Sequence, residues 1–276
     1  MNGVLAINKP EGMTSFDVVK KISRALGVKA GHTGTLDPMA TGVMLVCVNK
    51  ATKLVPYLMA GQKTYQATIS FGIKTDSKDK TGQIIASSPI IPFTLNQAKQ
   101  ACQSMIKTYS QQVPQVSAVR VDGKRLYKTK GDVILPTREV TIYDCDVIAS
   151  DEKTLTYEAT VSKGTYIRVL SEEIASLVVG NIATTSMLCR LNNNHVHIND
   201  TQSIEEAISH PNWLDLRVLL SDYLIIDVDD PEFVYHGKTK SFACDQDKII
   251  LFYQNQPIAV YQKTENDIYK SERGLF

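Results

Sequence analysis

The sequence lacks any long hydrophobic run. A membrane-spanning helix needs roughly 20 consecutive apolar residues, and no stretch of the 276 residues approaches that length. The first residues, MNGVLAINKPEG, have no basic start followed by a long apolar core, so we expect no secretory signal. With 43% apolar and 21% charged residues, the composition is that of a soluble globular protein with a sizeable core.

Cysteine is scarce and shows no pairing pattern. The five cysteines lie at positions 47, 102, 145, 189 and 244, with no CxxC spacing among them. An odd, scattered set argues against a disulfide framework and against a structural zinc site. We therefore expect reduced thiols and a cytoplasmic location.

Cofactor motifs are also missing. The chain has no GxxxxGK[ST] phosphate loop, and GHTG at residues 31–34 lacks the GxGxxG spacing of a dinucleotide site. Residues 76–87 have the glycine at the wrong position for a calcium loop. His195 and His197 share one strand face, but no third metal ligand accompanies them. We expect neither a cofactor nor a metal.

The net charge of +1 hides an uneven distribution. Residues 1–200 carry 23 lysines and arginines against 16 acids, whereas residues 201–276 carry 7 against 13. The densest basic cluster lies between Arg120 and Lys130, with five cations and Tyr127 among them. A basic body with such a cluster is typical of a protein that binds a polyanion. The cluster is a candidate RNA-facing loop.

One loop is rich in glycine and proline and contains a single acidic residue. Residues 31–42, GHTGTLDPMATG, hold three glycines, one proline and only one carboxylate, Asp37. Glycine permits backbone conformations that other residues resist, and proline fixes one torsion. A loop built in this way has a defined shape, and Asp37 is the group that this shape holds.

The hydrophobic patterns predict helices and strands without regular βαβ alternation. A helix capped by Thr14 or Ser15 should run to Gly27 with Phe16, Val19, Ile22 and Leu26 on its apolar face. Strict alternation through Tyr65 predicts a half-buried strand. The remaining predicted elements are helices at 51–59, 94–106 and 169–178 and strands at 4–7, 43–48, 139–148, 155–161 and 184–191.

This order of elements indicates the fold class. Long strands with interspersed helices favour an α+β fold with a mixed, largely antiparallel sheet flanked by helices. From about Leu220 the pattern changes to short β-rich segments, which predict a small β-barrel-like module. We therefore expect two domains, 1–215 and 222–276.

Five ordered blocks resemble the pseudouridine synthases of the bacterial TruB type. They cover residues 9–191, and the loop around Asp37 closely resembles the signature loop of that family. Met39 stands where this loop usually has a bulkier residue. The blocks are KPEGMTS at 9–15, KTY at 63–65 with its following TDS loop, QVPQVSA at 112–118 with GKRLY at 123–127, SKGTYIR at 162–168, and LCRL at 188–191.

The resemblance implies a pseudouridine synthase fold with a PUA-like RNA-binding domain at the C-terminal end. It implies isomerisation of uridine 55 in the T-loop of tRNA, by flipping out the base and without a cofactor. It identifies Asp37 as the nucleophile, assisted by Arg168 and Tyr65. Substrate-binding residues implied or expected are His32, Tyr166, Leu188, Lys9, Lys124 and Arg125. We expect a monomer that binds the T-arm of tRNA, with no membrane partner.

Other readings stay open at this stage. A glycoside hydrolase would need a second acid about 5–10 Å from Asp37, for which Asp76 or Asp79 could serve. An RNA-binding module without activity would tolerate the loss of Asp37. Guide-RNA-dependent relatives share the loop, but this chain shows no added terminal segments of the kind they use to assemble.

Overall fold

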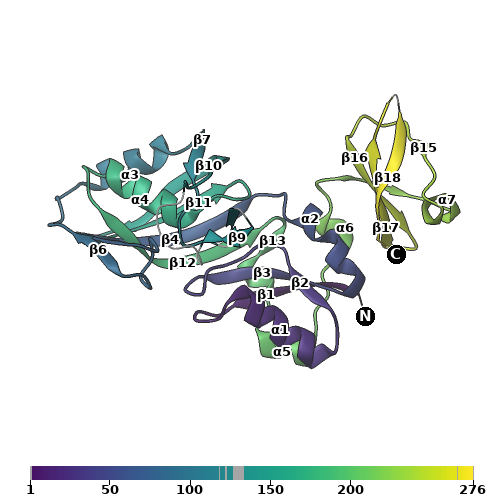
Figure 1. Ribbon diagram of the computed structural model, residues 1–276, viewed down its shortest axis with the longest axis horizontal. Helices are drawn as coiled ribbons and strands as arrows, with labels where there is room; N and C mark the ends of the chain where they lie inside the picture. Colours follow the sequence, from purple (N-terminus) through teal and green to yellow (C-terminus); the bar gives the residue numbers. More distant parts are fainter. Residues whose placement is uncertain (1, 118, 122, 127–133, 266, 276) are drawn as a thin grey trace.

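The protein is built around a large mixed sheet, seen in Figure 1. The computed structural model describes residues 2–117, 119–121, 123–126, 134–265 and 267–275. The main strands follow the order β1-β3-β12-β4-β11-β10-β7, with β2 and β13 attached to β3 and β12. All pairs in this sheet are antiparallel except β12 with β3. The predicted α+β class with a mixed, largely antiparallel sheet is confirmed.

The strands of this sheet come from the whole length of the first 200 residues. They are β1 (Gly3–Lys9), β2 (Ala30–His32), β3 (Thr41–Val48), β4 (Lys63–Phe71), β7 (Thr108–Gln112), β10 (Thr137–Ser150), β11 (Thr154–Val161), β12 (Ala183–Asn193) and β13 (Val196–His197). Two small hairpins lie outside it: β5 (Ile73–Thr75) with β6 (Ile84–Ser87), and β8 (Arg120–Val121) with β9 (Lys124–Arg125).

Helices cover one face of the sheet and join one large apolar core with it. Those in this core are α1 (Ser15–Leu26), α3 (Leu95–Ser104), α4 (Ile167–Leu177) and α5 (Ile204–Ser209). Each of these helices contributes buried apolar side chains to this core. Four short helices complete this part of the chain: η1 (Asn49–Leu54), α2 (Val55–Leu58), η3 (Ile198–Asp200) and α6 (Leu216–Leu219).

The local signals for α1 are confirmed except at one residue. Thr14 caps the helix with a reciprocal capping box to Asp17, and Gly27 ends it in a left-handed conformation with φ +64°. The buried positions are Ser15, Val18, Val19 and Ile22. Phe16 was expected on the apolar face but is 68% exposed. The helix turns Ser15 inward instead, where its hydroxyl is hydrogen-bonded to the loop that carries Asp37.

The apolar run Val43–Val48 is explained by burial of β3 on both faces. Met44, Val46 and Val48 belong to the core beneath the helices. Val43, Leu45 and Cys47 belong to a second core, which includes η1, α2 and α6. A strand covered on both sides loses the alternation of polar and apolar residues that a half-exposed strand shows.

The C-terminal residues form a separate five-stranded sheet of order β14-β16-β17-β18-β15. Its elements are β14 (Leu224–Asp227), α7 (Glu232–Tyr235), β15 (Lys240–Ser241), β16 (Lys248–Tyr253), β17 (Gln256–Lys263) and β18 (Ile268–Gly274). Its small, β-rich architecture fits the predicted PUA-like module. The boundaries 1–215 and 222–276 stay a prediction.

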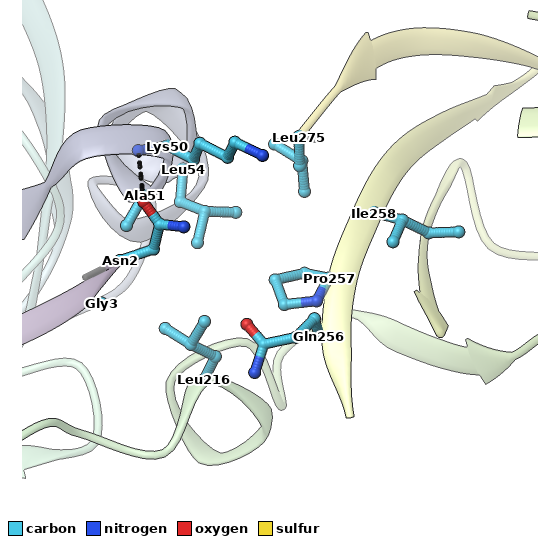
Figure 2. A pocket seen from close by; sticks show the side chains of 10 residues that line it. All are labelled: Asn2, Gly3, Lys50, Ala51, Leu54, Leu216, Gln256, Pro257, Ile258 and Leu275. Carbon is cyan, nitrogen blue, oxygen red and sulfur yellow. Dashed lines mark hydrogen bonds between the residues drawn. The ribbon is translucent and has the colours of Figure 1, made fainter. Parts of the chain in front are cut away.

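This C-terminal sheet shares the second core with the main body. Ile250, Phe252, Val260 and Leu275 pack in one cluster with residues of β1, β3 and α2. Beside the cluster lies a cavity of about 180 Å³, where Figure 2 shows side chains of the main body facing Pro257 and Leu275. Within the described residues, no helix combines the length and the hydrophobicity required of a membrane span.

Candidate active site

The loop that carries Asp37 is fixed to the start of the chain. The Ser15 hydroxyl donates to the carbonyl of Leu36 at 3.0 Å and accepts from the Leu36 amide at 2.8 Å. The Gly12 amide donates to the carbonyl of Pro38 at 2.8 Å. Backbone groups on both sides of Asp37 are thus hydrogen-bonded, so the carboxylate projects from a defined backbone.

Lys9 supplies a further anchor, which corrects its expected role. Its side chain is fully buried, and Nζ donates to the carbonyls of Pro10 at 2.9 Å, Pro38 at 3.3 Å and Ala40 at 2.7 Å. A contact with the RNA backbone was expected, but a buried ammonium that already holds three carbonyls does not reach a phosphate. Lys9 therefore positions the Asp37 loop from beneath.

Arg168 lies directly against Asp37. Its Nε is 2.8 Å from the Asp37 Oδ2, and the side chain of Arg168 is only 3% exposed whereas that of Asp37 is 35% exposed. Arg168 also donates to the carbonyls of Ser77 and Val116. The guanidinium is thus locked by the protein, while one face of the carboxylate is open to an incoming group.

Asp79 lies on the other side of Arg168, and sequence reasoning did not place it there. Its Oδ2 is 3.5 Å from Arg168 Nη1, and its side chain is 6% exposed. Its Oδ1 accepts from the Ser77 hydroxyl and from both the amide and the hydroxyl of Thr81. The signal in the sequence was its position two residues after the TDS segment at 75–77. Asp79 is engaged structurally, so it is not a free second acid for glycoside hydrolysis. Asp76, the alternative, accepts from the Gln83 amide.

Asp37 lies in a cleft of about 390 Å³ at the middle of the sheet. Of its described lining residues, Asp37 is the only carboxylate, whereas five are cations. Those cations are Lys63, Arg138, Lys163, Arg168 and Arg190. Such an excess of positive charge favours a polyanion such as RNA.

The aromatic and apolar walls come from three different elements. Tyr65 on β4 is 8% exposed and Leu188 on β12 is 5% exposed, and both line the cleft. Tyr166 precedes α4, and its backbone is clamped by the Gln111 side chain, which accepts from its amide at 2.8 Å. The Arg138 guanidinium lies 5.3 Å from the Tyr166 ring centroid. The structure therefore brings all three predicted wall residues to one cleft.

His32 lies at the end of β2, at the base of the same loop. Its Nδ1 accepts from the Gly34 amide at 3.3 Å. Burial, and then the nearby Arg190 guanidinium, lower the pKa of His32, which favours the neutral ring at physiological pH. It is not among the residues that line the cleft around Asp37.

The basic cluster at 120–130 is described only in part. Lys124 and Arg125 form β9, which pairs with β8. Their contact with RNA stays a prediction. Tyr127, Lys128 and Lys130 lie outside the described residues.

Comparison with solved structures shows which fold this is. The crystal structure of a Cbf5–Nop10–Gar1 complex matches with a TM-score of 0.75 and 21% identity, over 99% of this chain and 85% of that one. An H/ACA RNP bound to a substrate RNA containing 2′-deoxyuridine matches with a TM-score of 0.74 and 18% identity, over the same shares. The chain has the pseudouridine synthase fold.

Sequence comparison gives the family. Residues 20–167 match the model of the TruB family pseudouridylate synthase N-terminal domain. Proteins named tRNA pseudouridine synthase B are similar to this chain. The protein of Syntrophobacter fumaroxidans is 39% identical, over 81% of this chain and 75% of its own length. The protein of Oceanobacillus iheyensis is 32% identical, over 99% of this chain and 97% of its own length. That of Syntrophotalea carbinolica is 40% identical over 63% of this chain, and the match spans only 58% of the relative.

With this fold, the matched family model and the similar sequences make the protein a pseudouridine synthase, an isomerase that acts on RNA. Within that class, the chain belongs to the TruB family.

Proposed function

We propose that this enzyme isomerises uridine to pseudouridine at position 55 in the T-loop of tRNA, with Asp37 as the nucleophile. The observation that carries the proposal is the geometry of Asp37, a half-exposed carboxylate held by a buried arginine in an otherwise cationic cleft. The similarity to proteins named tRNA pseudouridine synthase B supports tRNA as the substrate.

The reaction breaks the bond between N1 and C1′, turns the uracil, and joins its C5 to C1′. No atom is gained or lost and no electron is transferred, so the chemistry requires no cofactor. It does require a group that attacks the nucleoside and later leaves, which an ionised carboxylate can do. The open face of Asp37 suits attack either at C1′ of the sugar or at C6 of the base.

In this proposal Tyr65 receives the uracil. A base stacked on an aromatic ring gains about 1–3 kcal/mol, and Leu188 and Tyr166 complete the walls. A folded T-loop hides its bases, so the target uridine must be flipped into the cleft. In this proposal His32 contacts the flipped nucleotide from the base of the Asp37 loop.

The rest of the substrate lies along the basic body. Lys124 and Arg125 are proposed to contact the T-arm backbone, together with the cations at the rim of the cleft. The PUA-like module, about residues 222–276, would contact tRNA away from the T-loop. Because this end of the chain is acidic, that contact is local rather than broadly electrostatic. We propose that the enzyme acts as a monomer in the cytoplasm.

The decisive test compares the wild-type chain with Asp37→Asn on an unmodified tRNA transcript. Pseudouridine is mapped by carbodiimide treatment and primer extension, and binding is measured by filter retention. We expect one product at position 55 with the wild type, and no product but unchanged binding with Asp37→Asn. Asp76→Asn, a matched change outside the cleft, should stay active. Turnover by Asp37→Asn within tenfold of the wild type would refute the mechanism.

A further inference from the structure

Arg190 is among the largest fully buried side chains of the protein, and its strand lies between the strand of Tyr65 and the strand that follows the Asp37 loop. Its β12 backbone is in register with Tyr65 of β4 on one side and with Gly42 of β3 on the other. The side chain is 1% exposed and lines the cleft at its inner end. The order of the strands therefore places Arg190 between β4, which carries Tyr65, and the start of β3, where the Asp37 loop ends.

The guanidinium bonds to three separate segments of the site. Nε donates to the carbonyl of Val43 at 2.6 Å, Nη2 to the carbonyl of Gly34 at 3.2 Å, and Nη1 to the Tyr65 hydroxyl at 3.4 Å. Its carbon Cζ lies 6.0 Å from the centroid of the Tyr65 ring. One rigid planar group thus spans the entry of the loop, its exit, and the phenol.

Within the described residues, no carboxylate forms an ion pair with this guanidinium. The ion pairs of the cleft belong to Arg168, whereas the contacts of Arg190 are to neutral oxygens. Burying an unpaired charge is costly unless its N–H groups are hydrogen-bonded. A pure packing role could be filled by an apolar side chain without this cost, so the bonds themselves are the feature to explain.

We propose that Arg190 is a positioning residue of the isomerisation, which fixes the Tyr65 phenol and the Gly34 end of the Asp37 loop relative to each other. The inference rests on the proposed function and adds a residue to it. In this role Arg190 acts through Tyr65 and the loop rather than on the reacting atoms. It sets the distance between the aromatic platform and the attacking carboxylate, and small errors in such a distance lower the rate of a reaction strongly.

Two substitutions separate geometry from charge. Arg190→Lys keeps the cation, but a single ammonium cannot span three acceptors as the planar guanidinium does. Arg190→Gln keeps a planar donor and removes the charge. Arg217→Met is the matched control, because Arg217 is also a hydrogen-bonded arginine, with contacts to Asp227 and Asn255 far from the cleft.

The assay is single-turnover isomerisation of the tRNA transcript at saturating protein, with RNA binding and thermal unfolding measured in parallel. We expect Arg190→Lys to lower the rate at least 30-fold, with the Kd for tRNA changed less than threefold. Arg217→Met should keep the rate within twofold. In a Tyr65→Phe background, which lacks the hydroxyl acceptor, Arg190→Lys should cost much less than in the wild type.

Three results would overturn this role. The first is a folded Arg190→Lys variant with a rate within threefold of the wild type. The second is an equal fold-loss in rate from Arg190→Lys in the Tyr65→Phe background and in the wild type. If neither Arg190 variant folds, the residue is structural and the proposal fails as well. An inactive wild-type chain on the same transcript would instead refute the proposed function, so the two failures are distinguishable.

Discussion

Replacing Arg168 with methionine should affect both stability and turnover, for reasons that the structure separates. Methionine keeps much of the stem but removes the guanidinium between Asp37 and Asp79. Asp79 is almost fully buried, so its Oδ2 would be left without a counter-charge. Breaking a buried pair in this way costs about 3–5 kcal/mol. The ion pair of Arg168 with Asp37 is partly solvated, since the Asp37 side chain is 35% exposed. Its loss adds at most about 1 kcal/mol to the destabilisation.

The expected loss of stability is therefore about 4 kcal/mol, out of a typical total of about 5–15 kcal/mol. The folded fraction remains high in the absence of denaturant, so activity can still be measured. Without Arg168, Asp37 is neither oriented nor electrostatically supported, and the single-turnover rate should fall at least about 100-fold, which corresponds to about 2.7 kcal/mol. Binding of tRNA should change less than fivefold.

Urea unfolding followed by circular dichroism gives the first quantity, and pseudouridine formation on a tRNA transcript gives the second. Asp79→Asn is the informative companion, because it leaves Arg168 and Asp37 together and should retain more activity than Arg168→Met. Arg24→Met, at an exposed arginine near the end of α1, controls for the loss of one positive charge. An unchanged rate together with a stability loss below 1 kcal/mol in Arg168→Met would show that this reasoning is wrong.

Two other predictions concern neighbouring residues. Burial, with Arg190 and Lys163 nearby, lowers the pKa of Lys63 from 10.5 to about 8, so the folded chain releases this proton at a lower pH than the unfolded chain. The contribution of Lys63 to the free energy of unfolding should therefore rise between about pH 8 and 10.5. Urea unfolding should show that the free energy of unfolding of Lys63→Met depends less steeply on pH in this range than that of the wild type. The same pH dependence in both proteins would contradict this. Gly42 has φ +100°, and a Cβ added to it would lie 2.2 Å from the Arg190 carbonyl oxygen. Gly42→Ala should thus destabilise the protein by about 2–5 kcal/mol through strain and overpacking, whereas Gly12→Ala, strained at φ +84° but without a neighbour within 4 Å, should cost less in the same assay.

Local features of the sequence predicted many of the elements. The capping box at Thr14, the stop at Gly27 and the alternation through Tyr65 each correspond to an observed element. These signals depend on interactions within a few residues, so they are visible without the fold. The motif blocks gave the family in the same way, because their residue types and order are properties of the chain itself.

The run Val43–Val48 shows what local signals leave open. Its apolar character predicted a buried strand, but not that the two faces belong to different cores. One of those cores is shared with the C-terminal sheet, which sequence reasoning treated as an independent module. No periodicity in one segment can report which distant segment will cover it.

The sequence by itself determined the family, the predicted helices and strands and the loop that presents Asp37. Only the tertiary structure decided what each charged side chain does around that loop. The sequence predicts Lys9 to be one of the cations that contact the RNA backbone, yet folding buries its ammonium against three carbonyls. Asp79 and Arg190 are 42 and 153 residues from Asp37, and strand order and register bring them to the site. The role of a charge depends on its burial and its partners, and both are created by folding.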